Sequence, residues 1–389
     1  MESWRRKLRM GMVGGGPGAF IGPVHRLCAQ MDGQAEMVAG CFSRDYEKTK
    51  AACEELYLDP ERCYETYQQM ADREAELPED RRIDFVSVVT PNVSHFDICK
   101  AFLENGIHVV CDKPMTYTLE QARELVELVE ETGLVFGLTH NYTGYPLVRE
   151  AREMFRRGEM GQVRKVMVEY LQEFLMYPHE KEGSKQAQWR TSRSESGIAG
   201  TIGDVGTHAF NLLEYITGEQ IEQLCCDAET WLPDRELDND AQMLIRLEGG
   251  GKGTLLCSQI ATGEENHLWV RIYCENGAVI WDQENPNYMK LYRYGEPREV
   301  YTRGRDEFQT DAAMEATRIP WGHPEGYLEA FANIYCDMFE AIRAYIDGRP
   351  METEEYAFPT VYDGLRGMQF IYAAVESAEN ESRWEPVER

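Results

Sequence analysis

An apolar strand that runs directly into a glycine-rich turn constrains the fold of this 389-residue chain more than any other feature. Leu8 to Val13 is apolar and of strand length, Gly14 to Gly22 supplies the turn, and a helical pattern continues from about Pro23 to Met31. Three small residues of the turn fit the spacing G-x-G-x-x-A: Gly14, Gly16 and Ala19. Because such residues lack bulky side chains, the backbone can turn tightly and its amides can approach a pyrophosphate at the helix N-terminus. The order of strand, glycine turn and helix therefore predicts a dinucleotide-binding unit.

The turn also predicts which residues hold the cofactor phosphates. They are Gly14, Gly16, Gly18, Ala19, Phe20 and Ile21. Pro17 lacks a backbone amide and Phe20 to Pro23 lengthen the loop, so the pattern leaves open which amides contact phosphate.

Strands and helices alternate from this first strand to about residue 140. Further strands are expected at Glu36–Phe42, Phe85–Val89, Ile107–Cys111 and Leu134–Leu138, and helices at Asp45–Tyr57, Val93–Asn105 and Leu119–Thr132. Such alternation requires right-handed crossovers and predicts a doubly wound parallel sheet, an α/β Rossmann domain over residues 1–140.

The carboxyl ends of parallel strands meet at one edge of the sheet, where a dinucleotide would lie. Besides the glycine turn, the residues predicted at this edge are Ser43-Arg44, Thr90-Pro91-Asn92 and Asp112-Lys113. An acid at the end of the second strand would accept hydrogen bonds from the ribose of NAD, but Ser43 and Arg44 suit the 2′-phosphate of NADP instead. The pattern therefore favours NADP over NAD, although Asp45 follows at once and Arg44 could pair with it.

The pattern changes after residue 140. Helices are expected at Tyr145–Arg157, Pro324–Asp347 and Val361–Glu379. Strands separated by turns are expected at Val163–Leu175, Ile221–Trp231, Ala241–Leu247, Gly253–Ile260, Trp269–Cys274, Ala278–Trp281 and Met289–Tyr294. This arrangement predicts a second domain, residues 141–389, of the α+β class with a large and mostly antiparallel open sheet.

Composition limits the partners of the chain. A net charge of −28 would repel nucleic-acid phosphates and anionic lipids, so neither is expected as a partner. No apolar run reaches the length of a membrane span and no signal sequence precedes the first strand, so we expect a cytoplasmic protein. The cysteines lack Cys-x-x-Cys spacing, and many, such as Cys41, Cys111 and Cys257, lie in apolar runs, so we expect buried free thiols. The histidines are scattered, and no metal site is predicted.

Several short motifs, in order along the chain, resemble those of the glucose-fructose oxidoreductase, inositol dehydrogenase and rhizopine-catabolism (Gfo/Idh/MocA) oxidoreductases. They are Thr90-Pro91-Asn92 with His95, Asp112-Lys113-Pro114 in place of the family's Glu-Lys-Pro, Trp189-Arg190, the Asp-x-x-x-His motif of Asp204 and His208, and Asp363-Gly364. The resemblance implies an NAD(P)-dependent oxidoreductase with a Rossmann domain before an open antiparallel sheet, which pairs subunits into a homodimer or homotetramer. It further implies cofactor contacts from His95, Asp112, Lys113, Trp189 and Arg190.

The resemblance also implies that Lys113 and His208 form the catalytic acid/base pair and that Asp204 orients the substrate. Oxidation of a sugar hydroxyl removes its proton while hydride leaves the same carbon for the nicotinamide, so a base must lie within hydrogen-bonding distance of that oxygen. A histidine, whose ordinary pKa is about 6.5, suits this role at neutral pH. The Lys113 ammonium can stabilise the developing alkoxide or relay the proton. His208 is favoured as the base, and the reverse assignment stays open.

Aromatic and polar side chains elsewhere are candidates for binding a neutral polyol, because rings stack on sugar C–H faces and hydroxyls need donors and acceptors. These candidates are His140, Asn141, Tyr142, His323 and Tyr327. The expected activity is hydride transfer between NADP or NAD and a hydroxyl carbon of a sugar, glycoside or cyclic polyol. Two alternatives stay open: glycoside cleavage or epimerisation through a transient keto-sugar, and a cofactor-binding sensor without turnover, which the acid/base set disfavours.

Overall fold

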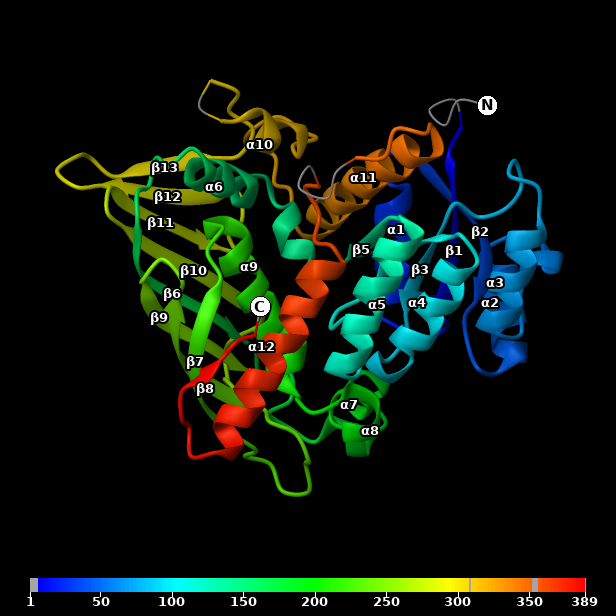
Figure 1. Ribbon diagram of the computed structural model, residues 1–389, viewed down its shortest axis with the longest axis horizontal. Coiled ribbons are helices and arrows are strands. Elements are labelled where there is room, and N and C mark those ends of the chain that lie inside the picture. The colour runs from blue at the N-terminus through cyan, green and yellow to red at the C-terminus, as the bar shows by residue number, and fades with distance from the viewer. Residues whose placement is uncertain (1–5, 308, 352–355, 389) are drawn as a thin grey trace. The chain divides into compact units, whose positions relative to one another are not determined.

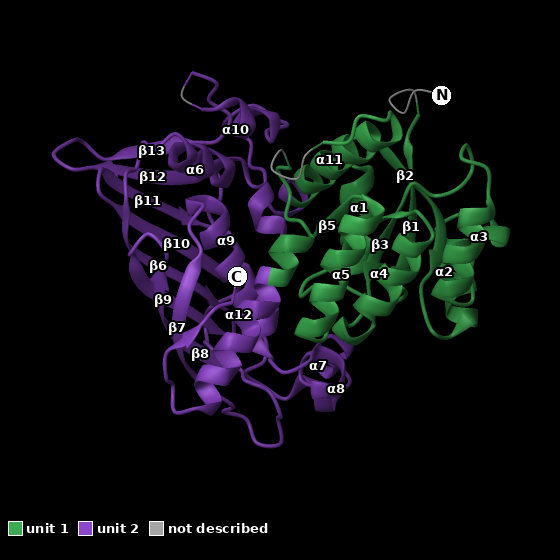
Figure 2. Cartoon of the chain, viewed as in Figure 1, with its two compact units in different colours: residues 1–139, 331–365 green, residues 140–330, 366–389 purple. Residues whose placement is uncertain are grey.

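The computed structural model describes residues 6–307, 309–351 and 356–388 of the chain. It divides into two compact units, which Figure 2 shows in different colours. Unit 1 comprises residues 1–139 and 331–365, and unit 2 comprises residues 140–330 and 366–389. The predicted second domain, 141–389, therefore differs from unit 2, because residues 331–365 pack with the N-terminal unit.

Unit 1 contains a five-stranded parallel sheet in the order β2-β1-β3-β4-β5 (Figure 1). Its strands are β1 (Leu8–Gly14), β2 (Ala35–Cys41), β3 (Phe85–Val89), β4 (His108–Cys111) and β5 (Phe136–Leu138). Its helices within residues 6–139 include α1 (Ile21–Gln30), α2 (Tyr46–Glu55), α3 (Tyr67–Glu76), α4 (His95–Glu104) and α5 (Leu119–Thr132). The predicted doubly wound fold is confirmed. The strand order reverses between β1 and β3, and doubly wound sheets bind their ligands in the crevice at such a reversal.

Helix α3 was not among the predicted elements, because its segment shows no apolar stripe. Only Met70, Ala71 and Glu74 of this helix are buried. The Glu74 carboxylate accepts hydrogen bonds from the Tyr64 hydroxyl at 2.7 Å, from the Ile83 amide at 3.0 Å and from Arg62, so the buried charge is paired. A polar network rather than an apolar face holds this segment.

An aromatic face of helix α11 (Tyr327–Ile346) completes the core of unit 1. Phe331, Tyr335 and Phe339 are spaced by four residues, each is at most 1% exposed, and the rings of Tyr335 and Phe339 lie 6.3 and 5.4 Å from that of Phe85 on β3. This packing places residues 331–346 with the parallel sheet. The sequence reveals the apolar face of this helix but not the sheet that it covers.

Unit 2 is built on a nine-stranded sheet in the order β13-β12-β11-β10-β6-β9-β8-β7-β14. Its strands are β6 (Val163–Leu171), β7 (Ile221–Glu229), β8 (Asp240–Leu247), β9 (Lys252–Ser258), β10 (His267–Cys274), β11 (Gly277–Asp282), β12 (Tyr288–Arg293), β13 (Glu299–Thr302) and β14 (Glu385–Pro386). Only the pair β6 and β9 is parallel among these described strands. The predicted mostly antiparallel sheet is confirmed.

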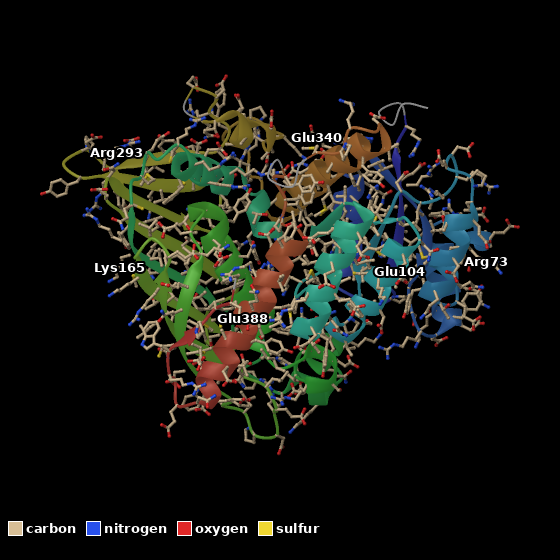
Figure 3. All side chains as sticks on the ribbon, in the orientation of Figure 1. Arg73, Glu104, Lys165, Arg293, Glu340 and Glu388 are labelled. Atoms are coloured by element: carbon tan, nitrogen blue, oxygen red, sulfur yellow. A yellow bond between two sulfur atoms is a disulfide. The ribbon has the colours of Figure 1, made fainter. Side chains whose placement is uncertain are left out.

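Helices cover one face of this sheet. They include α6 (Pro146–Arg156), α9 (Thr207–Thr217) and the part of α12 (Val361–Glu379) that belongs to unit 2. The ring of Phe210 on α9 stacks on that of Phe370 on α12 at 4.6 Å. On β6, Val166 and Val168 are buried, whereas Lys165 is exposed and lies on the outside of the sheet (Figure 3). This alternation is typical of a sheet with one covered and one open face.

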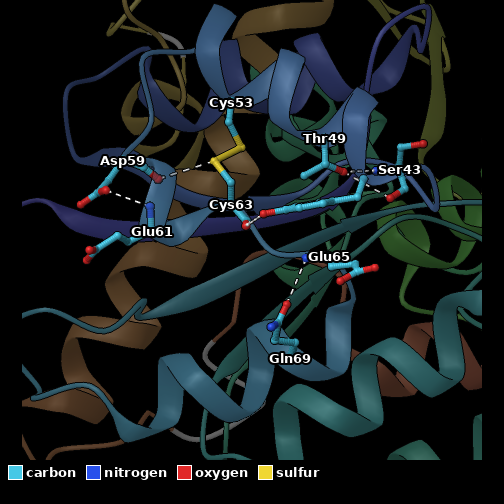
Figure 4. The surroundings of a disulfide bond; sticks show 9 residues. Ser43, Thr49, Cys53, Asp59, Glu61, Cys63, Glu65 and Gln69 are labelled. Atoms are coloured by element: carbon cyan, nitrogen blue, oxygen red, sulfur yellow. Dashed lines mark hydrogen bonds between the residues drawn. A yellow bond between two sulfur atoms is a disulfide. The ribbon is translucent and has the colours of Figure 1, made fainter.

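A disulfide joins Cys53 on α2 to Cys63, which follows the 3₁₀ turn Pro60–Arg62 (Figure 4). The two Cα atoms lie 6.3 Å apart, within the range that a disulfide spans. The expectation of free thiols throughout is wrong for this pair, because the turn folds residues ten positions apart onto each other. The expectation of buried free thiols is confirmed for Cys41, Cys111 and Cys257.

No helix in the described ranges has the length and apolarity needed to cross a membrane. Within the same ranges, no group of three or more His, Cys, Asp or Glu side chains could hold a metal ion.

Candidate active site

The glycine turn after β1 packs directly against the first turn of α1. A Cβ on Gly22 would lie 2.4 Å from the Gly15 Cα, and a Cβ on Gly14, whose φ is +85°, would lie 2.7 Å from the Val89 carbonyl oxygen. Side chains at these positions are therefore excluded. Gly22 lies outside the predicted G-x-G-x-x-A spacing, and its role is visible only from this close approach.

The N-terminus of α1 suits an anion. Its N-cap residue, Phe20, makes no side-chain capping hydrogen bond, and the first turn holds no acidic residue. Exposed amides and the positive end of the helix dipole therefore face the glycine turn without a competing carboxylate. These features suit an anion, and the contact of Gly14 to Ile21 with the pyrophosphate of a dinucleotide stays a prediction.

The end of β2 lies beside this turn, since a Cβ on Gly16 would be 2.7 Å from the carbonyl oxygen of Phe42. Ser43 and Arg44 follow, and the Arg44 side chain is exposed. The Asp45 carboxylate caps α2 by accepting from the Glu47 amide at 3.1 Å and forms an ion pair with Lys48 at 3.3 Å. Asp45 is thus used in capping the helix.

His95 connects two of the predicted edge loops within unit 1. Its Nε2 lies 2.7 Å from the carbonyl oxygen of Thr90, and its Nδ1 lies 3.0 Å from that of Pro114. Burial lowers the pKa of His95, so the neutral ring donates to one of these carbonyls at a time. His95 was predicted to contact the cofactor, but it is fully buried and instead positions the loops that hold Thr90-Pro91-Asn92 and Asp112-Lys113.

Asp112 belongs to a buried chain of polar groups. Its Oδ1 accepts from the Thr139 hydroxyl at 2.5 Å and lies 3.3 Å from His25 Nε2. The His25 Nδ1 contacts the Tyr335 hydroxyl at 2.7 Å, which in turn contacts Ser87 Oγ at 2.8 Å. Burial would raise the pKa of Asp112, but His25 and the Thr139 hydrogen bond outweigh it and hold that pKa below its usual value. An ionised Asp112 is therefore fixed beside Lys113.

Asp204 is the central acid of unit 2. It lies on a π-helical turn, Ile202–Gly206, that precedes α9. The Asp238 carboxylate holds the start of this turn by accepting from the amides of Gly200 at 2.6 Å and Ile202 at 2.8 Å. The predicted α-helical spacing of Asp204 and His208 is therefore replaced by a wider turn followed by an α-helix.

Two side chains from elsewhere in unit 2 meet the Asp204 carboxylate. Arg190 Nε and Gln259 Nε2 each lie 2.9 Å from Oδ2 of Asp204. The Arg190 guanidinium also lies 4.2 Å above the ring of Trp189. The Trp189-Arg190 pair, predicted to contact the cofactor and expected in a loop, ends helix α7 (Lys185–Arg190) and positions Asp204.

His208 is buried in the first turn of α9, among aromatic rings of unit 2. Its Nδ1 lies 3.3 Å from Nδ1 of His140, with the two rings nearly perpendicular at 85°. The ring of Tyr142 lies 4.8 Å from that of His208. A hydrogen bond between two Nδ1 atoms requires one donor and one acceptor, so His140 restricts the tautomer of His208.

A buried network of phenols and amides surrounds this histidine pair. The hydroxyls of Tyr142 and Tyr170 lie 2.5 Å apart, and Tyr170 donates to Asn266 Oδ1 at 2.8 Å. Asn266 donates to Gln283 Oε1 at 2.9 Å, and Gln283 donates to the Tyr145 hydroxyl at 3.2 Å. Burial raises the pKa of Tyr142 and Tyr170, so both phenols stay protonated and can donate.

Three of the predicted substrate residues therefore lie near His208. They are His140, Tyr142 and Tyr327, whose ring is 6.4 Å from that of Tyr142. Asn141 is buried, and its Nδ2 has no hydrogen-bond partner among the described residues. His323 is exposed in the loop before α11. Of the predicted acid/base pair, Lys113 belongs to unit 1 and His208 to unit 2.

Sequence reasoning missed the residues that position the predicted ones. They are His25, Thr139, Tyr170, Asp238, Gln259 and Asn266. Only His25 could have been proposed from the sequence, because it is a histidine on the apolar face of the helix that follows the glycine turn. The others reach the site through contacts that are distant in sequence.

Two consecutive parts of the chain match models of known domains. Residues 8–140 match an oxidoreductase family with an NAD-binding Rossmann fold, and residues 148–280 match the GFO/IDH/MocA C-terminal domain. The chain belongs to the Gfo/Idh/MocA oxidoreductase family. Its resemblance to Gfo/Idh/MocA proteins, predicted from short motifs, is thus confirmed, and it is an NAD-dependent oxidoreductase of that family.

Proteins similar to this Gfo/Idh/MocA chain include two solved structures that cover nearly its whole length. An oxidoreductase from Sinorhizobium meliloti is 44% identical over 97% of this chain and 99% of its own, with a TM-score of 0.86. An inositol dehydrogenase homolog from Azotobacter vinelandii, complexed with NADH and myo-inositol, is 32% identical over 99% of both chains, with a TM-score of 0.92. The levoglucosan dehydrogenase of Pseudarthrobacter phenanthrenivorans is 25% identical over 78% of this chain and 80% of its own.

Proposed function

We propose that this protein oxidises a hydroxyl carbon of a neutral sugar or cyclic polyol, with His208 as the base. The observation that carries the proposal is the contact between Nδ1 of His208 and Nδ1 of His140 at 3.3 Å. When His208 Nδ1 donates to His140, the lone pair of His208 lies on Nε2, the atom that can accept a hydroxyl proton. When Nε2 gains that proton, Nδ1 keeps its hydrogen bond, so the imidazolium that forms is stabilised.

The groups around His208 suit a substrate with several hydroxyls. Asp204, held by Arg190 and Gln259, can accept a hydrogen bond from a second hydroxyl of the same ring. Lys113, which belongs to unit 1, keeps the role that the family resemblance implies for it, that of partner to His208 in the acid/base pair. The nicotinamide, when bound, accepts the hydride from the carbon that is oxidised.

Similar proteins support the same class of substrate. The Azotobacter vinelandii structure contains myo-inositol with NADH, and the Pseudarthrobacter phenanthrenivorans relative is a levoglucosan dehydrogenase. Both compounds are neutral and carry ring hydroxyls. We extend this class to the present chain because His208 lies among phenols in unit 2, and the Asp204 carboxylate is paired with Arg190 and hydrogen-bonded to the Gln259 amide.

The cofactor preference is a separate part of the proposal. The Rossmann domain binds NAD in this family, and the preference for NADP predicted from Ser43 and Arg44 stays a prediction. Two features of the structure support it. Arg44 is exposed beside the glycine turn, and Asp45 is used in capping α2 and pairing with Lys48.

The experiment is a panel of sugars, glycosides and inositols, each incubated with NAD⁺ or NADP⁺ while the absorbance of reduced cofactor is followed. Net reduction with at least one compound, abolished in His208→Asn, is the expected result. Product formation without net reduction would favour transient oxidation, as in glycoside cleavage or epimerisation. Cofactor binding without any product from any compound would favour a sensor.

A further inference from the structure

The disulfide of unit 1 lies at the end of β2, the strand that leads into the loop predicted to contact the ribose of the cofactor. Cys53 lies on α2, and Cys63 forms a parallel bridge with Gly40 on β2. The Tyr64 amide also donates to the Gly40 carbonyl oxygen at 3.0 Å. The bond between the two sulfurs therefore ties α2 to a segment that is itself paired with β2.

A second connection runs from the same face of α2 to that loop. Thr49 lies one turn before Cys53, and both are buried. Thr49 Oγ1 accepts from the Ser43 amide at 3.1 Å and donates to the Ser43 carbonyl oxygen at 3.2 Å (Figure 4). Phe42 precedes Ser43, and its carbonyl oxygen is the atom that a Cβ on Gly16 would approach to 2.7 Å. The position of α2 thus sets the position of this loop beside the glycine turn.

Apolar packing contributes little to holding α2 in place. Of its ten described residues, Thr49, Ala52 and Cys53 are buried. The Tyr46 hydroxyl also donates to the Cys63 carbonyl oxygen at 3.3 Å, a long neutral hydrogen bond. Elements with few buried apolar contacts open at little cost in free energy, and a disulfide opposes opening because it restricts the opened chain. Attachment of α2 to β2 therefore depends on whether the two sulfurs are bonded.

A small thiol can reach the disulfide when the loop over it opens. Cys53 and Cys63 are themselves buried, but most of the residues at 54–62 that connect them are exposed. The thiolate of one glutathione attacks a sulfur of the bond and forms a mixed disulfide, and a second glutathione releases it. Oxidised glutathione leaves, and the two cysteine thiolates take up the protons that the two glutathione thiols lost. The reverse reaction, with oxidised glutathione as the oxidant, restores the bond.

We propose that Cys53 and Cys63 form a reversible redox-modification site that sets the affinity of the Rossmann unit for its nicotinamide cofactor. In the disulfide form, α2 is fixed and the loop of Ser43 and Arg44 is ordered before the cofactor arrives. In the dithiol form, part of the binding energy is used to order α2 and this loop, so the cofactor is held less tightly. The inference concerns cofactor binding, and it does not depend on which compound the protein oxidises.

The experiment measures the Kd of NAD and of NADP by calorimetry, for one preparation held in oxidised glutathione or in dithiothreitol. A thiol count on the unfolded protein verifies the two states. The oxidised form should show nine thiols, because two of the eleven cysteines are bonded, and the reduced form eleven. We expect the Kd of the preferred cofactor to rise about ten-fold on reduction, below the roughly 100-fold that closure of a loop of this size can contribute.

Matched variants identify the cysteines responsible. The double variant Cys53→Ser, Cys63→Ser cannot form the bond, so its Kd should equal that of the reduced wild type in both buffers. Cys274→Ser removes a free, half-buried thiol of unit 2 and should keep the full response. Amide hydrogen exchange should become faster in α2 on reduction and stay unchanged in α5, which shows that the unit remains folded.

The outcomes separate this inference from the proposed function. Equal Kd values for the two redox states would overturn the inference, whether or not exchange in α2 changes. A wild type with eleven thiols in every glutathione buffer would overturn it as well. A redox-dependent Kd in a protein that oxidises no sugar or polyol would support the inference and contradict the proposed function.

Discussion

His25 Nε2 lies 3.3 Å from Oδ1 of Asp112, although the two residues come from different elements of the Rossmann unit and His25 is fully buried. His25 is held in turn by the Tyr335 hydroxyl at 2.7 Å. The acid beside Lys113 is thus anchored through a helix from the other end of the chain. Tyr335 therefore affects both the stability of unit 1 and the position of the Asp112-Lys113 loop.

Tyr335→Phe should lower the free energy of unfolding by about 1–3 kcal/mol, because it leaves buried groups of His25 and Ser87 without their partner. Denaturant unfolding measures this difference. Tyr294→Phe, at a fully exposed position, serves as the matched control and should change stability little. An equal effect of both substitutions would show that the Tyr335 hydroxyl makes no net contribution.

Lys113→Met and His208→Asn should each lower kcat by about 10² or more, because acid/base groups typically contribute 10² to 10⁴ in rate. Cofactor binding, followed by nicotinamide fluorescence, should stay close to that of the wild type in both variants. Near-normal turnover in both would refute their assignment as the acid/base pair.

The buried His108 should make unfolding pH-dependent. Burial lowers the pKa of His108 to about 4, and its Nδ1 accepts from the Val135 amide at 2.9 Å. The unfolded histidine takes up a proton below about 6.5 while the folded one stays neutral, so stability is full above pH 6.5 and falls as the pH drops toward 4. The loss should reach roughly 3 kcal/mol, from about 1.4 kcal/mol per pKa unit.

Denaturant unfolding at pH 7.0 and 4.5 checks this prediction. His108→Asn supplies a neutral acceptor that does not titrate, so the variant should lose less stability over this range than the wild type. The same pH dependence in both proteins would exclude His108 as its source.

Arg44→Ala should weaken NADP binding more than NAD binding, by about 1.5–3 kcal/mol, the contribution of a charged hydrogen bond. Titration of both cofactors into the wild type and the variant measures the two dissociation constants. A wild-type Kd that is lower for NAD, or an equal loss for both cofactors, would show that Arg44 does not recognise the 2′-phosphate.

We propose that the open face of the nine-stranded sheet pairs with a second subunit. Leu244 on β8 is 51% exposed, between the buried Met243 and Ile245. Light scattering should give a dimer or tetramer of the 44.8 kDa chain, and Leu244→Glu should shift it toward the monomer. A monomer at micromolar concentration would refute the proposal.

Local signals in the sequence were enough for much of the fold. The helix predicted at Leu119–Thr132 has these same bounds in the structure, where Thr118 and Gln121 form a capping box at its start and Gly133, at φ +65°, ends it. The predicted strand, glycine turn and helix at the start of the chain is also confirmed. Short-range chemistry determines each of these features.

Long-range contacts limited the prediction of the site. Arg190 was expected at the cofactor because the Trp189-Arg190 pair resembles a family motif. In the structure Arg190 pairs with Asp204, and this contact depends on how two segments of unit 2 fold together. The disulfide of Cys53 and Cys63 depends in the same way on a turn whose residues are polar. No periodicity in the sequence encodes which distant side chain fills a given hydrogen-bonding position.

The chain passes between the two units after residues 139, 330 and 365. During synthesis the five strands of the Rossmann sheet leave the ribosome nearly two hundred residues before Phe331, Tyr335 and Phe339, which cover Phe85 on β3. An N-terminal fragment ending at residue 139 would therefore expose an uncovered aromatic and apolar surface and tend to aggregate. The nucleotide-binding unit can complete its core only when translation is almost finished, so Phe85 on β3 stays uncovered by α11 in the nascent chain until then.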